Sequence, residues 1–131
     1  MRSISKGSKL YSILFNKCPK CHVGKFWASD NPFKNMFFNT KNTCKTCENC
    51  SLAYELETGF WYGSMYVSYA ISVAVMVLFW SLTTILFPLI NIFNEIIIIV
   101  LAIILVSPIN YHVSRLIWIN FFVKYIPNDT N

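Results

Sequence analysis

Glu55-Leu-Glu-Thr-Gly-Phe-Trp-Tyr-Gly-Ser-Met-Tyr-Val-Ser-Tyr-Ala70 is the stretch of the chain that decides its fold. Before this joint the sequence is polar and lysine-rich and contains all five cysteines, and after it the sequence is almost entirely apolar. Tryptophan and tyrosine are enriched where a membrane meets water, because their rings are apolar and their tips form hydrogen bonds. The aromatic cluster in the joint therefore predicts a cysteine-rich head that meets a membrane anchor.

The composition also indicates a membrane segment. Of the 131 residues, 55% are hydrophobic and 13% are charged, which is too apolar for an ordinary soluble domain of this size. Nine of the eleven Lys and Arg residues precede Tyr62, and one charge, Glu95, lies between Tyr62 and His112. Basic residues that flank membrane spans set their orientation. The net charge of +5 therefore favours a topological role, and we expect no nucleic-acid partner.

Two apolar runs predict a transmembrane hairpin. Val67 to Phe87 contains no charge, Pro or Gly, and its helix would span about 30 Å, the thickness of the hydrocarbon layer. A short turn separates it from the second run, which begins at Ile96. We expect spans at about 64–87 and 95–114 within a hairpin of residues 59–125. Basic residues before the first span and after the second, Arg115 and Lys124, predict a protein of the bacterial inner membrane with both termini in the cytoplasm.

The second span is expected to change direction and to end at the membrane surface. Pro108 lies inside the run and predicts a kink, because proline lacks an N–H group. The residues after it predict a C-terminal interfacial helix, followed by a tail at 126–131. Four residues are candidate interface anchors, because Arg reaches the headgroups and aromatic rings prefer the boundary: Trp61, Tyr62, Arg115 and Trp118.

The cysteines predict a metal site in the head, residues 18–58. Cys18-Pro-Lys-Cys21 supplies one Cys-x-x-Cys pair, and Cys44, Cys47 and Cys50 offer two overlapping pairs. Four thiolates make a tetrahedral structural Zn²⁺ site. Cys47 with Cys50 is favoured over Cys44 with Cys47, because Ser51 is small and suits the following turn, so Cys44 is the spare or alternative ligand. Disulfides need an oxidising compartment; dithiol redox chemistry and another soft metal remain alternatives.

The rest of the head is expected to be a zinc-ribbon-like β structure. Short strands and a turn are predicted between the two cysteine pairs, with a last strand over 52–56. Aromatic residues are expected to form its small hydrophobic core: Phe26, Phe33, Phe37 and Phe38. A head of this size buries little surface, so the metal would supply much of its folding energy. Residues 1–17 read as a basic arm that contains a short amphipathic helix over 10–15.

Small residues recur along the joint and the first span. Their spacing lets helices approach closely, and serines can form hydrogen bonds across such a contact. They face either the second span of the same hairpin or another integral membrane protein. The candidate packing residues are Gly59, Gly63, Ser64, Ser68 and Ser72, with Ala70 and Ala74 on a neighbouring stripe.

From Cys18 onward, the chain resembles the small bacterial membrane proteins grouped as domain of unknown function 983, in the form found in Bacteroidetes-like sequences. The matching segments are Cys18-Pro-Lys-Cys21, Cys47-x-x-Cys50 followed by Tyr54-Glu-Leu-Glu, Gly59 to Ala70, and Ser114-Arg-Leu-Ile-Trp118-Ile-Asn. Family members usually carry Gly after each second cysteine, where His22 and Ser51 stand here. The resemblance implies that Cys47 and Cys50, rather than Cys44, belong to the metal site. It implies no established activity; some relatives are similar in setting to accessory proteins encoded near haem–copper oxidase genes, which points to assembly work.

The expected fold is thus an α-helical membrane hairpin with a small zinc-ribbon-like β head. The expected function is that of a non-catalytic accessory, assembly or scaffold subunit of an inner-membrane complex, for example a respiratory oxidase. Its partners would be the bilayer and another integral membrane protein, with no small-molecule substrate. The alternative is a membrane-bound thiol- or metal-handling protein that uses Cys44. His112 is read as a packed or interfacial residue rather than a haem ligand, and an enzyme is not expected.

Overall fold

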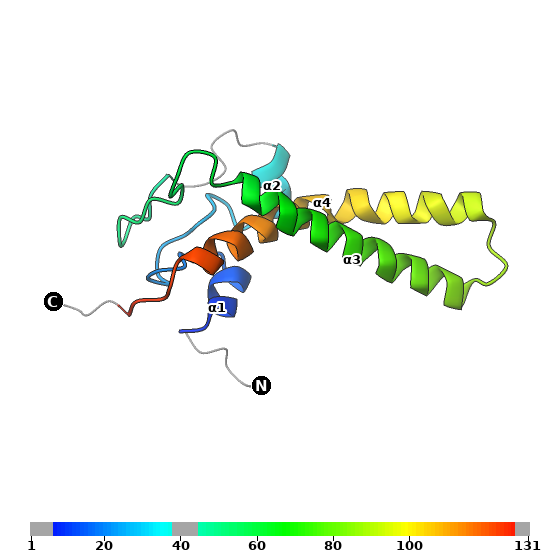
Figure 1. Cartoon of the computed structure of the whole chain (residues 1–131), viewed down its shortest axis with the longest axis horizontal. Coiled ribbons are helices and arrows are strands. Elements are labelled where there is room, and N and C mark those ends of the chain that lie inside the picture. The colour runs from blue at the N-terminus through cyan, green and yellow to red at the C-terminus, as the bar shows by residue number, and fades with distance from the viewer. Residues whose placement is uncertain (1–6, 38–44, 128–131) are drawn as a thin grey trace.

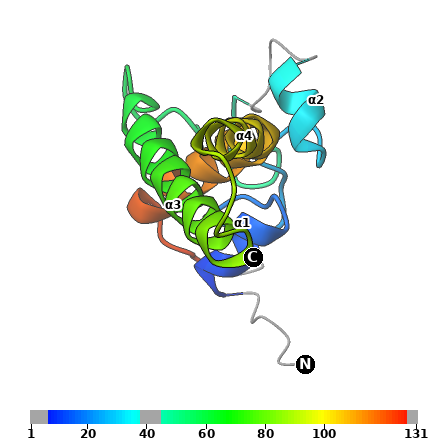
Figure 2. The same ribbon diagram turned by 90° about the vertical axis from the view of Figure 1, so that its right-hand side faces the viewer.

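The computed structural model describes residues 7–37 and 45–127. These residues form four helices: α1 (Lys9–Leu14), α2 (Pro32–Phe37), α3 (Tyr62–Leu86) and α4 (Ile92–Phe122). In Figure 1, α3 and α4 extend to one side as a long hairpin, and α1, α2 and the loops surround its opposite end. α1, α2 and α3 each contact α4, and within the described residues they do not contact one another. Figure 2 shows α4 between α3 and α2; α4 is the element on which the rest of the protein packs.

The hairpin turn is set by capping groups at both of its ends. α3 ends at Leu86, and the N–H of Phe87 donates to Thr83 O at 2.9 Å before Pro88 prevents the helix from continuing. Asn91 caps α4, because its side-chain oxygen accepts from Phe93 N at 3.1 Å. The Thr83 hydroxyl donates to Glu95 Oε1 at 2.9 Å. This hydrogen bond joins the two helices beside the turn.

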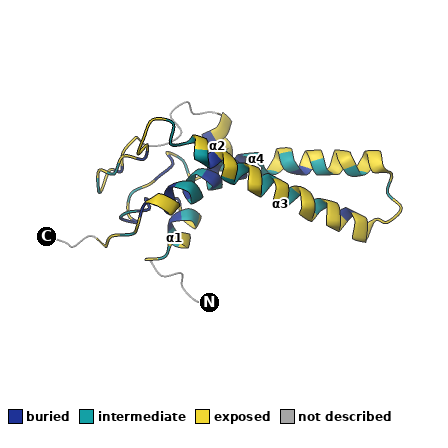
Figure 3. Ribbon diagram, viewed as in Figure 1, coloured by how far each residue is buried: buried dark blue, intermediate teal, exposed yellow. Residues whose placement is uncertain are grey.

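α3 and α4 are each long and apolar enough to cross a membrane. In the most apolar stretch of each helix, only 6% of α3 and 11% of α4 is buried within the protein. Figure 3 shows the same contrast, because the buried residues gather at the head end and the hairpin is largely exposed. A core helix of a soluble protein would be mostly covered, so this much apolar surface requires another environment to cover it.

The second helix is longer than the predicted span of 95–114. α4 continues without interruption to Phe122, so the predicted interfacial helix is the last part of α4 and not a separate element. The physical reason is that Leu116 and Ile119 are fully buried against the head, which stabilises helix beyond the apolar run. Pro108 lies inside α4, and Figure 1 shows the C-terminal part of the helix running in a different direction from its N-terminal part.

The predicted β structure of the head is not supported. The described residues form no strand, only two isolated antiparallel bridges, between Lys17 and Lys25 and between Thr46 and Ala53. Each bridge closes the turn around one Cys-x-x-Cys pair, and the chain then packs on α4 instead of extending into a sheet. Where strands and a turn were expected, α2 forms; Asn31 caps it by accepting from Phe33 N at 3.0 Å.

The core of the head also differs in its members from the predicted one. Phe26 is fully buried, but Phe33 and Phe37 are exposed, and Phe38 lies outside the described residues. The buried core instead combines residues of the head with residues of α4: Cys18, Cys21, Phe26, Trp27, Cys47, Tyr54, Leu116, Ile119 and Val123. The head therefore has no separate core of its own, because α4 supplies one wall of it.

Candidate metal centre

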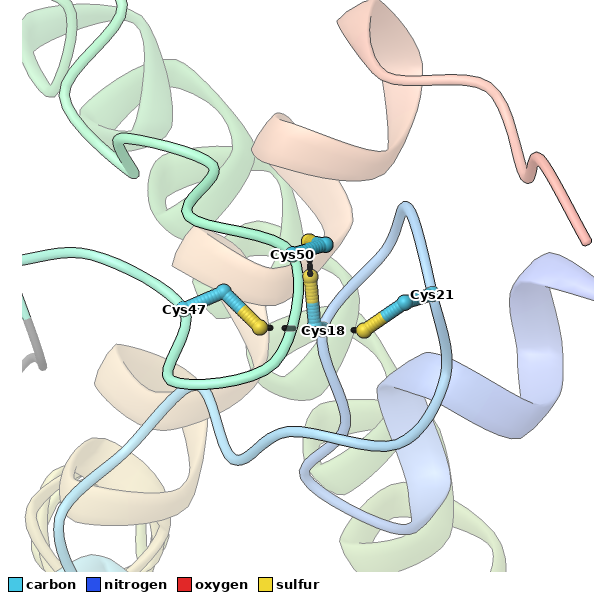
Figure 4. Close-up of side chains that lie close together, drawn as sticks. All are labelled: Cys18, Cys21, Cys47 and Cys50. Atoms are coloured by element: carbon cyan, nitrogen blue, oxygen red, sulfur yellow. Dashed lines mark hydrogen bonds between the residues drawn. The ribbon is translucent and has the colours of Figure 1, made fainter. Parts of the chain in front are cut away.

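Four cysteine side chains meet in the head. The sulfur atoms of Cys18, Cys21, Cys47 and Cys50 all lie within 4.8 Å of one another, as Figure 4 shows. The Cys18 and Cys50 sulfurs are 3.7 Å apart, and so are those of Cys21 and Cys47. In a tetrahedral zinc site with bonds of about 2.3 Å, neighbouring sulfurs are about 3.8 Å apart. The four thiols are free cysteines, and their separations fit one metal ion at the centre of the group.

Two similar turns place the four sulfurs. In the first turn, Cys18 N donates to Gly24 O at 2.8 Å and His22 N donates to Cys18 O at 3.0 Å. In the second, Cys47 N donates to Leu52 O and Ser51 N donates to Cys47 O, both at 2.9 Å. Cys18 thus corresponds to Cys47 and His22 to Ser51. The bond that closes the first turn reaches one residue further than in the second, but the shared pattern makes the two Cys-x-x-Cys units a pair of similar turns.

His22 and Ser51 each directly follow the second cysteine of a Cys-x-x-Cys pair. Their φ angles are 55° and 53°, in the left-handed region that glycine adopts without steric cost. The ring of His22 packs 4.3 Å from the ring of Tyr125 and 5.7 Å from that of Tyr11. The side chains of these two residues therefore do not prevent the turn, although each places a non-glycine residue in a strained backbone conformation.

The two turns also pack closely on each other. A Cβ atom added to Gly24 would come within 2.5 Å of the Cys47 sulfur, so only glycine fits at this point of the first turn. Tyr54, 1% exposed, donates its hydroxyl to Lys25 O at 2.9 Å. Its ring lies 4.8 Å from that of Phe26. The cysteine group is therefore enclosed by aromatic side chains on one side and by its own backbone on the other.

The protein environment acts unequally on the thiols. Burial raises the pKa of Cys18 to about 12, although backbone N–H groups of Cys21 and Lys20 oppose it. Burial also raises the pKa of Cys50. At Cys21 burial acts in the same direction, but the N–H groups of Gly24 and Val23 outweigh it and lower the pKa to about 6. Four thiolates this close together repel one another, so their joint ionisation requires a cation among them.

The donor set fits a metal ion and indicates its chemical class. Four sulfur ligands without an oxygen donor suit soft or borderline metals, and hard cations such as Mg²⁺ and Ca²⁺ prefer oxygen. A closed group of four protein ligands leaves no open coordination position, which is typical of a structural site. Cys44, predicted as the spare or alternative ligand, lies outside the described residues.

The aromatic residues predicted as interface anchors differ in their surroundings. Trp61 packs on Phe26 and Phe60, with ring centres 5.8 Å and 5.2 Å apart. Trp118 donates its indole N–H to Phe60 O at 2.9 Å. Tyr62 is 72% exposed. Thus Trp61 and Trp118 contact the protein, and only Tyr62 points away from it.

Arg115 contacts aromatic rings from both the head and α4. Its guanidinium carbon lies 4.6 Å from the ring centre of Tyr111, 5.1 Å from that of Trp61 and 5.8 Å from that of Trp27. Such cation–π contacts stabilise a charged group that is only partly hydrated. Arg115 is therefore held at the junction of the head and the hairpin.

The small residues of the first span fall into two groups. Gly63 faces α4, because an added Cβ would overlap the indole ring of Trp118. Asn110 of α4 donates to Ser68 O at 3.0 Å and to the Ser72 hydroxyl at 2.9 Å. Ser64 is buried and donates to Trp61 O at 2.7 Å. These residues pack within the hairpin.

Gly59 does not belong to the same helix face. It precedes α3, and its φ of 81° lies in the left-handed region, so it forms a turn that directs the chain into the helix. Ala70 and Ala74, on the neighbouring stripe, are exposed. The predicted glycine pair is therefore a turn residue followed by a helix-packing residue.

Sequence reasoning missed the contacts that join the head to α4. The Trp27 indole N–H donates to His112 O at 3.2 Å, and the two rings stack with centres 5.0 Å apart. The Asn35 amide nitrogen lies 3.2 Å from His112 Nδ1. Asn120 donates to the Ser12 hydroxyl at 3.1 Å, which attaches α1. The available signal was Asn120, a polar amide within an apolar stretch of sequence, because such a group needs a partner when it is buried.

Comparisons of the chain with protein-family models, with curated proteins and with solved structures found no match.

Proposed function

We propose that the protein is an integral protein of the bacterial inner membrane, with α3 and α4 as its spans and both termini in the cytoplasm. The exposed apolar surface of the two helices supports this proposal, because lipid would cover it. The charge distribution supports the orientation: nine Lys and Arg residues precede Tyr62, and none lies between Tyr62 and His112. The head then lies on the cytoplasmic side, where thiols stay reduced.

In this setting the four cysteines hold a structural Zn²⁺ ion. The ligand set of Cys18, Cys21, Cys47 and Cys50, their spacing and the closed coordination support zinc. The ion supplies folding energy to a head that shares its core with α4. In this role it holds two turns together and takes no part in a reaction.

The function that follows is that of a non-catalytic accessory or assembly subunit of a membrane protein complex, such as a respiratory oxidase. One observation carries this proposal: the head is fixed to α4 by the buried contacts of Trp27, Asn35 and His112. Because the head is held in one orientation relative to the two spans, a partner meets a rigid surface. The spans provide its part within the membrane, and the head provides its part at the cytoplasmic face. Such preorganisation lowers the entropic cost of association.

The hairpin offers an exposed surface for a partner in the membrane. Ala70 and Ala74 lie one helical turn apart on the outer side of α3, and small residues at this spacing permit close helix contact. Ser68 and Ser72 are already engaged with Asn110 of the same chain. A partner helix would therefore pack on the alanine side of α3 and not on the serine side.

Quantitative co-purification from a mild detergent tests the proposal. The tagged protein should recover a defined membrane protein or complex at constant stoichiometry. Ala70→Leu with Ala74→Leu should reduce that recovery by about tenfold, because two branched side chains prevent close approach. Val100→Leu changes an exposed position of α4 and should leave recovery unchanged.

Two results would count against the accessory role. The first is recovery of the protein alone, as a uniform monomer or homodimer, under conditions that preserve known membrane complexes. The second is equal loss of the partner in the Val100→Leu control, since this would show that recovery depends on general detergent behaviour. Metal content is measured in each variant, so that an unfolded head is not mistaken for a lost interface.

A further inference from the structure

A cleft lies where the joint meets α3 and α4, and Arg115 lines it. Its volume is about 920 Å³, within the range of about 300–1,000 Å³ that is usual for small-molecule sites. Residues of the joint line one side, including Glu55 and Thr58, and Tyr62 and Tyr69 of α3 add phenol groups. The cleft is thus separate from the cysteine group and contains a cation and several hydroxyl groups.

Arg115 forms no ion pair within the described residues, and the one carboxylate that acts on its charge, that of Glu55, does so without direct contact. The one ion pair found there joins Lys25 and Asp30. The contacts of the guanidinium are with the aromatic rings of Tyr111, Trp61 and Trp27. These rings interact with its charge and do not accept the directional hydrogen bonds of its five N–H groups. Arg115 therefore presents hydrogen-bond donors to the cleft, in the geometry that suits phosphate.

The position of Arg115 along α4 indicates where a ligand would come from. Glu95 and Arg115 lie twenty residues apart in α4, a path of about 30 Å along the helix, which is close to the hydrocarbon thickness. If Glu95 lies at the outer surface, Arg115 lies at the level of the inner-leaflet phosphates. This step depends on the membrane location proposed above.

The surroundings of the cleft favour a lipid over a soluble anion. Met65 and Tyr69 line it, and both are largely exposed, at 65% and 71%. They continue onto the exposed apolar face of α3. A phospholipid could place its headgroup at Arg115 and its acyl chains along this face. A soluble phosphate would leave the apolar part of the cleft uncovered.

We propose that this cleft binds the phosphate headgroup of an anionic phospholipid through Arg115. Thr58 and the phenol groups of Tyr62 and Tyr69 provide further hydroxyl groups around the headgroup. Glu55 lies in the same lining and is exposed, so its carboxylate weakens the attraction without forming an ion pair with Arg115. Removing the charge of Arg115 should therefore weaken lipid binding, and removing the charge of Glu55 should strengthen it.

Lipid titration of the purified protein, followed by native mass spectrometry, tests the proposal. The probes are phosphatidylglycerol, the zwitterionic phosphatidylcholine, and glycerol 3-phosphate as a soluble phosphate. Phosphatidylglycerol should bind most tightly. Arg115→Gln should weaken it about tenfold, and Arg115→Lys should lie between the two because it keeps the charge without the planar fork. Glu55→Gln should strengthen binding about twofold to threefold.

Matched controls separate the cleft from general surface charge. Lys124→Gln removes the same charge as Arg115→Gln at an exposed position outside the cleft, and Glu57→Gln does the same for Glu55. Both controls should retain parental affinity. Equal effects of Lys124→Gln and Arg115→Gln would overturn the proposal, and so would parental affinity in Arg115→Gln.

The remaining outcomes also test the lipid proposal. Preferential binding of glycerol 3-phosphate over phosphatidylglycerol would overturn the lipid assignment. Metal content verifies that each variant is folded; if Arg115→Gln loses its metal, the comparison of Glu55→Gln with Glu57→Gln decides, and equal affinities there would overturn the proposal. The titration uses the isolated protein, so its result is independent of whether a partner co-purifies.

Discussion

Single asparagine side chains determine how the head and the helices are joined. Asn35, Asn110 and Asn120 are all buried, and each donates to a residue of a distant segment. A buried amide donor without a partner costs about 1–3 kcal/mol, so each of these contacts disfavours other packed arrangements in which the amide stays buried without its acceptor. The asparagines thereby give the protein one defined geometry where apolar packing alone would tolerate several.

The backbone strain at Ser51 leads to the first prediction. Ser51→Gly should raise the free energy of unfolding of the metal-bound head by about 0.5–1 kcal/mol, because glycine removes the cost of the left-handed conformation. His22→Gly relieves the same strain but loses the ring contacts with Tyr125 and Tyr11, so it should give no gain. Chemical denaturation of both variants at saturating zinc provides the measurement. A larger gain at His22 than at Ser51 would contradict this account.

The choice of ligand at the second turn gives the next prediction. Cys47→Ser should lose the metal, because it removes a sulfur that lies 3.7 Å from that of Cys21 and breaks a closed four-ligand set. Cys44→Ser, the matched control, should retain one metal ion per chain. Elemental analysis of the purified variants supplies the readout. If Cys44→Ser loses the ion and Cys50→Ser keeps it, the ligand set is Cys18, Cys21, Cys44 and Cys47.

The Cys44→Ser variant also separates the two functional alternatives. A protein that handles thiols or metals through a mobile cysteine would lose its function in this variant while keeping its zinc and fold. An accessory subunit would retain its partner. Partner recovery from Cys44→Ser membranes therefore distinguishes the two roles without altering the metal site.

Among the elements, the contact between Gly63 and Trp118 is the most restrictive in the hairpin. In an isolated helix, Gly63→Ala would stabilise α3 by about 1 kcal/mol. Here the added Cβ would overlap the Trp118 ring, so we expect a net loss of about 1–3 kcal/mol in hairpin stability. Unfolding by sodium dodecyl sulfate in mixed micelles measures it. In a Trp118→Leu background the same change should be much less harmful, and an equal loss in both backgrounds would refute the contact.

The two long helices were more predictable than the head, because the sequence pattern that predicts each helix lies within the helix itself. An uninterrupted apolar run fixes the presence and length of α3 without knowledge of its neighbours. The cysteine spacing likewise identified the two turns. The absence of strands from the described residues has a different cause: α2 forms where a strand was expected, and it packs against α4, which is far away in the sequence. The Asn31–Pro32 pair, a helix cap followed by proline at the first helical position, was a local signal for α2.

The same distinction explains what was missed at the candidate site. Four closely spaced sulfurs follow from the two Cys-x-x-Cys units, whereas the enclosure by Tyr54 and the contact of Gly24 with Cys47 need the turns in position. The left-handed φ at His22 and Ser51 was also not predicted, because only glycine adopts this conformation without steric cost. The sequence therefore predicted the sulfur ligands, which neighbouring residues supply. It did not predict the contacts that form only when the two turns face each other.

For the whole molecule, metal content and helix content should respond independently to a chelator. The head shares its core with α4, and a metal ion bound by the four cysteines would supply on the order of 10 kcal/mol to its folding. The hairpin satisfies its backbone hydrogen bonds internally. Metal removal should therefore unfold the two turns while α3 and the apolar part of α4 remain helical. In hydrogen exchange, residues 17–27 and 45–54 should lose protection, and residues 67–86 and 96–107 should keep it.

Two variants make this last prediction specific to the metal. Cys47→Ser without chelator should show the exchange pattern of the chelated parent, and Cys44→Ser with zinc should show that of the untreated parent. The contact between the head and α4 adds a further readout. Trp27 stacks on His112, so the fluorescence of Trp27 should change when the head unfolds. Full protection of the turns in the metal-free chain would show that α4 alone holds the head. Simultaneous loss of protection in α3 would show instead that head and hairpin fold as one cooperative unit, in which the metal stabilises the two long helices as well.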